Sequence, residues 1–204
     1  MKRADYAGEL AALPDFGLAA FALITWIRPS VFGLHWIRWF VLLMLVEFIV
    51  VHSSAFLGTI AFSRESAVRR IKGTILVSLF YTVFLVGFAL GFKTWWPIVT
   101  FWLLSANRLA GVLLGQAPSG AEQELIKRGW AAGAVFYILG VMVTILLPLP
   151  RLGINPHVVA QLDLPGSGEW ISHPHRAVAF AFVYFLAVAL SERKGHQWAR
   201  DRSR

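Results

Sequence analysis

The chain has 204 residues, of which 57% are hydrophobic and 15% charged, and its mean hydropathy is +0.64. Soluble domains carry roughly 25% charged residues, so the composition excludes an ordinary soluble protein and indicates a membrane protein. The lack of cysteine excludes disulfides and thiolate metal sites. The net charge of +8 comes largely from basic residues beside the expected helix ends, where they contact anionic lipid headgroups, so no nucleic-acid partner is expected.

Six apolar segments, taken in chain order, approach or reach the ~20 residues that cross a hydrocarbon core about 30 Å thick. They run roughly over 13–28, 37–61, 73–92, 95–116, 129–148 and 176–191. The first has the shortest continuous apolar run and also fits an interfacial or re-entrant helix. The sequence therefore predicts an all-α, polytopic integral membrane bundle of about six transmembrane helices, with 1–204 forming a single transmembrane domain.

The basic residues predict the orientation of this bundle. With six spans, the side that holds both termini receives 13 Lys and Arg residues, and the opposite side receives five. Because cytoplasmic loops are enriched in Lys and Arg, we expect both termini in the cytoplasm (N-in/C-in). The segment 149–175 is then a long outer-side loop, and 192–204 is a basic cytoplasmic tail.

Three glycine pairs are spaced four residues apart, a spacing that lets helix backbones approach closely in lipid. They are Gly87–Gly91, Gly111–Gly115 and Gly129–Gly133. Packing inside the bundle and self-association through these GxxxG faces are both open. Ala177, Ala181 and Ala187 are expected to serve close packing on the last helix.

Polar side chains interrupt the second and fourth apolar segments. Glu47, His52 and Ser54 lie in the second, and Ser105, Asn107 and Arg108 lie in the fourth. A charged group at membrane depth is costly and needs a partner. Glu47 and Arg108 are expected at similar depth on helices that run in the same direction, so the sequence predicts that they pair.

This intramembrane polar cluster has several interpretations. A buried ion pair that holds the bundle in register is the first, a proton or solute path is the second, and a catalytic site is the third. Tyr81, Ser78 and Tyr184 are candidates to complete the polar layer. A direct Glu47–His52 pair is not indicated, because residues five apart do not share a helix face.

Four of the six histidines fall on the expected outer side: His35, His157, His173 and His175. Pro174 disfavours a helical conformation at His173, which allows the imidazoles of His173 and His175 to lie on one side. Histidine nitrogens suit Zn, Cu or Ni. The chain has no HExxH motif, so this metal site rests on the histidines alone.

Glu47 in the second span, together with the run from Gly168 through Trp170 and Pro174 to Tyr184–Phe185, resembles an uncharacterised bacterial family of multi-pass inner-membrane proteins. The resemblance implies a bacterial inner-membrane location and no particular activity. The motifs of rhomboid-type, prenyl-processing and ceramidase-like membrane enzymes are absent.

The sequence thus favours a non-enzymatic accessory or scaffold protein of a membrane assembly. The alternatives are a proton-linked small transporter or channel that uses Glu47, His52 and Arg108, and a membrane-embedded enzyme with a metal site at the outer histidines.

Overall fold

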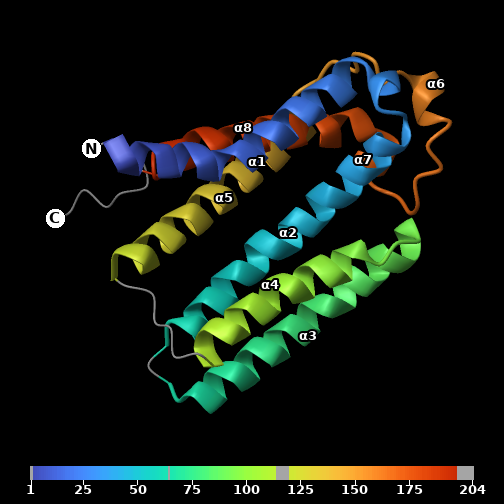
Figure 1. The fold of residues 1–204 in the computed structure, drawn as a ribbon. Helices are drawn as coiled ribbons and strands as arrows, with labels where there is room; N and C mark the ends of the chain where they lie inside the picture. Colours follow the sequence, from blue (N-terminus) through green and yellow to red (C-terminus); the bar gives the residue numbers. More distant parts are fainter. Residues whose placement is uncertain (1, 64, 114–119, 197–204) are drawn as a thin grey trace. The chain divides into compact units, whose positions relative to one another are not determined.

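A computed structural model of the chain describes residues 2–63, 65–113 and 120–196, and these are helical with short connections (Figure 1). The long helices are α1 (Lys2–Ile27), α2 (His35–Ala61), α3 (Ala67–Phe92), α4 (Trp96–Leu113), α5 (Gly120–Leu146) and α8 (Pro174–Arg193). The shorter elements are the 3-10 helix η1 (Pro29–Val31), α6 (Pro156–Val159) and α7 (Glu169–Ser172). No strand occurs in these three ranges.

Five of the helices are long and apolar enough to cross a membrane, namely Gly8–Ile27 within α1, and α2, α3, α5 and α8. The prediction of an all-helical membrane bundle is confirmed at this level. The predicted fourth span corresponds to α4, which is 18 residues long. Residues 114–116 of that predicted span lie outside the described part of the chain.

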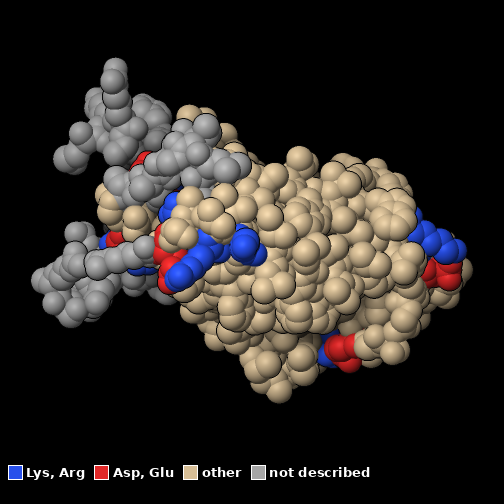
Figure 2. Space-filling model, turned by 90° about the horizontal axis from the view of Figure 1, so that it is seen from below, with Lys and Arg blue, Asp and Glu red and all other residues tan. Residues whose placement is uncertain are grey.

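Charged residues are distributed as a membrane protein requires. On the face shown in Figure 2, Lys, Arg, Asp and Glu gather in a few places, and most of the described surface on this face is uncharged. Large apolar side chains such as Leu76, Val83 and Leu103 are about two-thirds exposed, at 70%, 70% and 66%. Such side chains are stable on the outside of a bundle when hydrocarbon or another apolar surface surrounds them.

The structure divides into two compact units. Unit 1 comprises Met1–Met44 and Ala131–Arg204, and unit 2 comprises Leu45–Trp130. Each unit is described by itself.

In unit 1, α1 packs along α8 in the opposite direction, so that the first turns of α1 meet the last turn of α8 (Figure 1). The contact is lined by small residues, as predicted for the last helix. Ala12, Ala19 and Ala22 on α1, and Ala177, Ala181 and Ala189 on α8, are at most 2% exposed. Ala187, by contrast, is half-buried. Small side chains allow two helices to approach closely without a hydrophobic driving force from water.

The second half of α5 also packs against α8 in unit 1. Tyr137, Phe180 and Tyr184 form an aromatic cluster, with the ring of Tyr137 centred 4.9 Å from that of Phe180. Gly140 lies under Phe180, where a Cβ atom would overlap the ring. The Tyr137 hydroxyl donates to the Met44 carbonyl at 2.7 Å, which ties α5 to the first part of α2.

In unit 2, α3 and α4 form an antiparallel pair. The turn between them begins at Lys93, which adopts a left-handed conformation with φ of 53° as the C-cap of α3. Ser66 caps the other end of α3 by accepting a hydrogen bond from the Arg69 N–H. The last part of α2 joins this unit, and Ile60 packs against Gly73 on α3.

The predicted glycine pairs behave differently from one another. Gly87 is exposed, and a Cβ atom there would meet nothing within 4 Å, so no helix of the described chain packs closely against it. Gly133 is buried. For Gly111–Gly115, the close-packing prediction falls outside the described part of the chain. Self-association through a GxxxG face stays a prediction.

Candidate functional site

The polar layer of unit 2 is built from His52 on α2, Ser78, Tyr81 and Thr82 on α3, and Trp102 and Ser105 on α4. Tyr81 and His52 are joined through the Tyr81 hydroxyl and His52 Nδ1 at 2.8 Å. Ser78 donates to Ser105 Oγ at 3.2 Å, and both side chains are buried. Trp102 Nε1 donates to Thr82 Oγ1 at 3.0 Å. Tyr81 and Ser78 thus contact two predicted members of the polar cluster, His52 and Ser105, and the role of the cluster within a membrane stays a prediction.

Helical periodicity explains why these groups meet. Ser78 and Tyr81 are three residues apart on α3 and therefore share one face, and both are buried along with Thr74, Leu85 and Ala89. Since α3 pairs with α4 on this side, the hydroxyls at the contact bond each other rather than remain unpaired in an apolar interior.

The other predicted members of the cluster lie nearby or outside it. Ser54 Oγ donates to the Val50 carbonyl of its own helix at 2.6 Å. Asn107 is exposed on α4, and Glu47 is half-buried on α2. The side chain of Arg108 lies outside the described part of the structure, so its pairing with Glu47 stays a prediction. Tyr184 belongs to the aromatic cluster of unit 1.

The ring of His52 lies in an aromatic environment. Phe48 stacks on it with a centroid distance of 5.5 Å and an interplanar angle of 7°. Phe56 and Tyr81 present their edges at 5.6 and 5.7 Å. Residues 48, 52 and 56 are spaced four apart and so form one stripe of α2.

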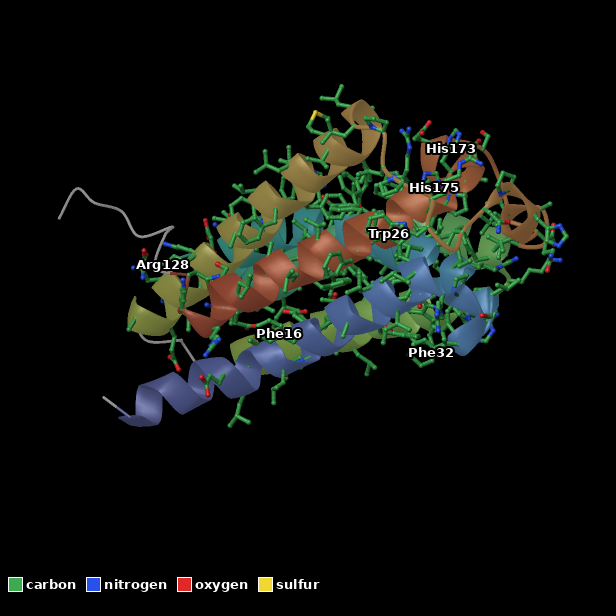
Figure 3. All side chains as sticks on the ribbon, turned by 90° about the horizontal axis from the view of Figure 1, so that it is seen from above. Phe16, Trp26, Phe32, Arg128, His173 and His175 are labelled. Atoms are coloured by element: carbon green, nitrogen blue, oxygen red, sulfur yellow. The ribbon has the colours of Figure 1, made fainter. Side chains whose placement is uncertain are left out.

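A second polar group, in unit 1, occupies the junction of α7 and α8. His173 and His175 lie close together there, with ring centroids 6.0 Å apart (Figure 3). His173 has φ of −130° and ψ of 63°, outside the helical region, as predicted from Pro174. Its Nδ1 atom lies 3.1 Å from Glu169 Oε1, and the same oxygen accepts from Arg176 Nη1 at 2.7 Å.

Arg176 links this junction to the end of α5. Its Nη1 atom donates to the Thr144 carbonyl at 3.0 Å, one of the last carbonyls of α5 and therefore unpaired within that helix. Arg70 does the same in unit 2, where Nη1 donates to the Ala61 carbonyl at the end of α2 at 3.1 Å. From the sequence, these two arginines entered only through the totals of basic residues on each side. Their second role is that of a cation at a helix C-terminus, where the helix dipole favours positive charge.

The four histidines predicted as metal ligands are all described. His35 lies against Trp36 with a centroid distance of 5.4 Å, and His157 is exposed on α6. Among the residues that the structure describes, no group of three or more His, Cys, Asp or Glu side chains is arranged to hold a metal ion. The structure therefore brings together His173 and His175 with Glu169, and a Zn, Cu or Ni site stays a prediction from sequence.

Comparison of the chain with family models, with curated proteins and with solved structures finds no match. The helices themselves indicate a multi-pass, all-helical membrane protein.

Proposed function

We propose that the chain is a non-enzymatic accessory or scaffold protein of a membrane assembly. In this proposal it crosses a bacterial inner membrane six times with both termini in the cytoplasm, α4 being the remaining span. The orientation rests on the 13 basic residues expected on one side against five on the other.

The observation that carries the proposal is the local pairing of polar groups in unit 2. Ser53 and Ser54 bond the carbonyl of Val50 in their own helix, and Ser78 bonds Ser105 across a helix contact. Groups satisfied in this way stabilise a bundle. Exposed apolar side chains on α3 and α4 supply the surface for lipid and for neighbouring membrane proteins.

Photo-crosslinking in intact cells tests the accessory function. A photoreactive amino acid replaces Leu76 or Leu103, which are 70% and 66% exposed, and as a matched control it replaces Leu85, which is 0% exposed. We expect discrete crosslinked products from the exposed positions and none to another chain from Leu85. Crosslinks to lipid alone at both exposed positions would contradict an accessory role.

A flux measurement distinguishes the transporter alternative. Purified protein in liposomes with a trapped pH indicator is expected to move no protons beyond protein-free liposomes. A proton flux that disappears in Glu47→Gln would instead favour the proton-linked transporter that uses Glu47, His52 and Arg108.

A further inference from the structure

His52 carries one ring nitrogen that the described chain does not use. Nδ1 is hydrogen-bonded to the Tyr81 hydroxyl, and within the described residues His52 makes no second hydrogen bond. The His52 side chain is exposed on the surface of α2. Its Nε2 atom is therefore available to a molecule outside the chain.

The Tyr81 hydroxyl determines whether the Nε2 atom of His52 carries a proton. Tyr81 is only 4% exposed, and among the described residues Nδ1 of His52 is its one hydrogen-bond partner. A buried hydroxyl that accepts without donating leaves its own proton unpaired, which is unfavourable in an apolar interior. The Tyr81 hydroxyl therefore donates to Nδ1, and in the tautomer that accepts this bond the ring N–H is at Nε2.

An N–H group at this depth needs an acceptor. His52 lies nine residues before the end of α2, or about 13 Å along the helix at 1.5 Å per residue. Hydrocarbon offers no acceptor, so an N–H group left unpaired there is strongly disfavoured. A phospholipid ester carbonyl can accept a hydrogen bond but carries no planar ring to stack on the neighbouring phenylalanines.

The surroundings of His52 favour a flat, apolar ring as the molecule that carries this acceptor. Phe48 and Phe56 flank the imidazole on α2 and are 48% and 51% exposed. Phe80 and Phe84 continue the aromatic surface on α3 at 59% and 47% exposure, and Phe80 contacts Tyr81 with a centroid distance of 5.2 Å. Aromatic side chains stack on planar rings in offset or edge-to-face arrangements.

We propose that His52, with Phe48, Phe56, Phe80 and Phe84, binds a lipid-soluble quinone ring whose carbonyl oxygen accepts a hydrogen bond from His52 Nε2. A quinone combines a planar ring, a strong carbonyl acceptor and solubility in hydrocarbon. Tyr81 is a positioning residue, because it holds the imidazole in the donor tautomer. The proposal concerns binding and stands independently of the accessory function.

The test uses the full chain in lipid nanodiscs and a decyl-tailed benzoquinone as the probe. Binding is measured as saturable quenching of tryptophan fluorescence, since Trp102 and Trp130 both belong to unit 2. Nitrogen-15 NMR of histidine-labelled protein reports the Nε2 signal of His52, which the His52→Phe variant assigns. We expect a saturable component in the native protein and a shift of this one signal on binding.

Three variants separate the hydrogen bond from ring packing. His52→Phe keeps an aromatic ring and removes both the Nε2 donor and the Nδ1 partner of the Tyr81 hydroxyl, and it is expected to weaken binding about tenfold. His52→Gln places an amide donor near the Nε2 position and is expected to retain most of the affinity. His157→Phe, on the exposed α6, is the matched control and should bind as the native chain does.

A ligand without the acceptor completes the design. The same decyl-tailed six-membered ring with methyl groups in place of both carbonyl oxygens, as a substituted benzene, should bind the native chain weakly and should bind His52→Phe equally weakly. If His52→Phe does not fold, as judged by size-exclusion chromatography, the comparison of quinone with this analogue on the native chain decides. Equal affinity of the native chain and His52→Phe for the quinone, or unsaturable quenching, would overturn the proposal. A native dimer that becomes monomeric in either His52 variant and binds no quinone would show instead that a second copy covers this face.

Discussion

The close approach of α5 and α8 depends on the absence of a side chain at Gly140. A Cβ atom added there would overlap the ring of Phe180, which is 1% exposed. The ring cannot simply move away, because Tyr137, Trp170 and Tyr184 surround it at centroid distances of 4.9, 5.5 and 5.8 Å. Gly140→Ala should therefore destabilise unit 1.

The magnitude follows from two opposing effects. Inserting a methyl group into a tightly packed core costs about 1–3 kcal/mol. The upper half of that range applies here, because other aromatic rings surround the buried ring of Phe180. Replacing glycine by alanine inside a helix returns about 1 kcal/mol. We expect a net loss of about 1–2 kcal/mol in the free energy of unfolding for Gly140→Ala.

Gly17 provides the matched control in the same unit. It lies within α1, and a Cβ atom there would meet nothing within 4 Å, so Gly17→Ala should be neutral or stabilising by up to about 1 kcal/mol. Thermal unfolding in mild detergent, followed by tryptophan fluorescence, should separate the two variants by about 2–12 °C in Tm for a chain of this size.

A double substitution tests the assigned cause. Phe180→Leu replaces the ring with a smaller branched side chain and should cost about 1 kcal/mol alone, while in combination with Gly140→Ala the two losses should be less than additive. Equal Tm values for Gly140→Ala and Gly17→Ala, or additive losses in the double variant, would refute the overlap of Gly140 and Phe180 as the cause.

Four further predictions follow from particular charges and loops. Glu47→Gln and Arg108→Gln should each lower detergent stability by about 3–5 kcal/mol if the two residues pair, and the double variant should recover much of this loss; additive losses would mean that they act separately. Reporter fusions at residue 120 and at the C-terminus should read cytoplasmic and one at residue 160 external; an external C-terminus would contradict the six-span count. Arg176→Gln should lower the free energy of unfolding by about 1–3 kcal/mol, because it leaves the Glu169 carboxylate and the Thr144 carbonyl without this donor. Arg151 is exposed, and Arg151→Gln should not lower it in the same unfolding assay. Burial lowers the pKa of His196, and nearby Glu192 opposes this only in part, so the folded state favours neutral His196. The free energy of unfolding should therefore be greatest above about pH 6.5 and should fall as the pH drops below it. His196→Gln should flatten that pH dependence.

Much of the helical layout could be predicted because apolar runs of membrane-spanning length are a strong signal. The predicted segment 37–61 corresponds to α2 at His35–Ala61, and 176–191 corresponds to α8 at Pro174–Arg193. The predicted segment 129–148 misses the start of α5, which begins at Gly120. Glu122, Glu124 and Lys127 make that first part polar, so hydropathy alone does not include it, although the helix continues through it.

Side-chain partners were less predictable than the helices. Ser78 and Tyr81 could be assigned to a polar layer from their position in an apolar segment, but the pairing of Tyr81 with His52 depends on how α2 and α3 are rotated about their axes. Gly140 was missed because it has no glycine four residues away. Its signal was the stripe Gly133, Tyr137, Gly140 and Thr144, which is buried along one face of α5.

The hydrogen-bond pattern of unit 2 distinguishes residues that hold the fold from a residue that is open to a ligand. Ser53 and Ser54 bond their own helix, and Ser78 bonds Ser105, so a substitution at any of them changes stability first. His52 differs because the described chain bonds only its Nδ1 atom, and its side chain is exposed beside Phe48 and Phe56 on α2. Loss of the Nε2 donor removes no hydrogen bond within the described chain. A substitution at His52 also removes Nδ1, the hydrogen-bond partner of the buried Tyr81 hydroxyl, so binding to His52 variants has to be compared alongside their stability.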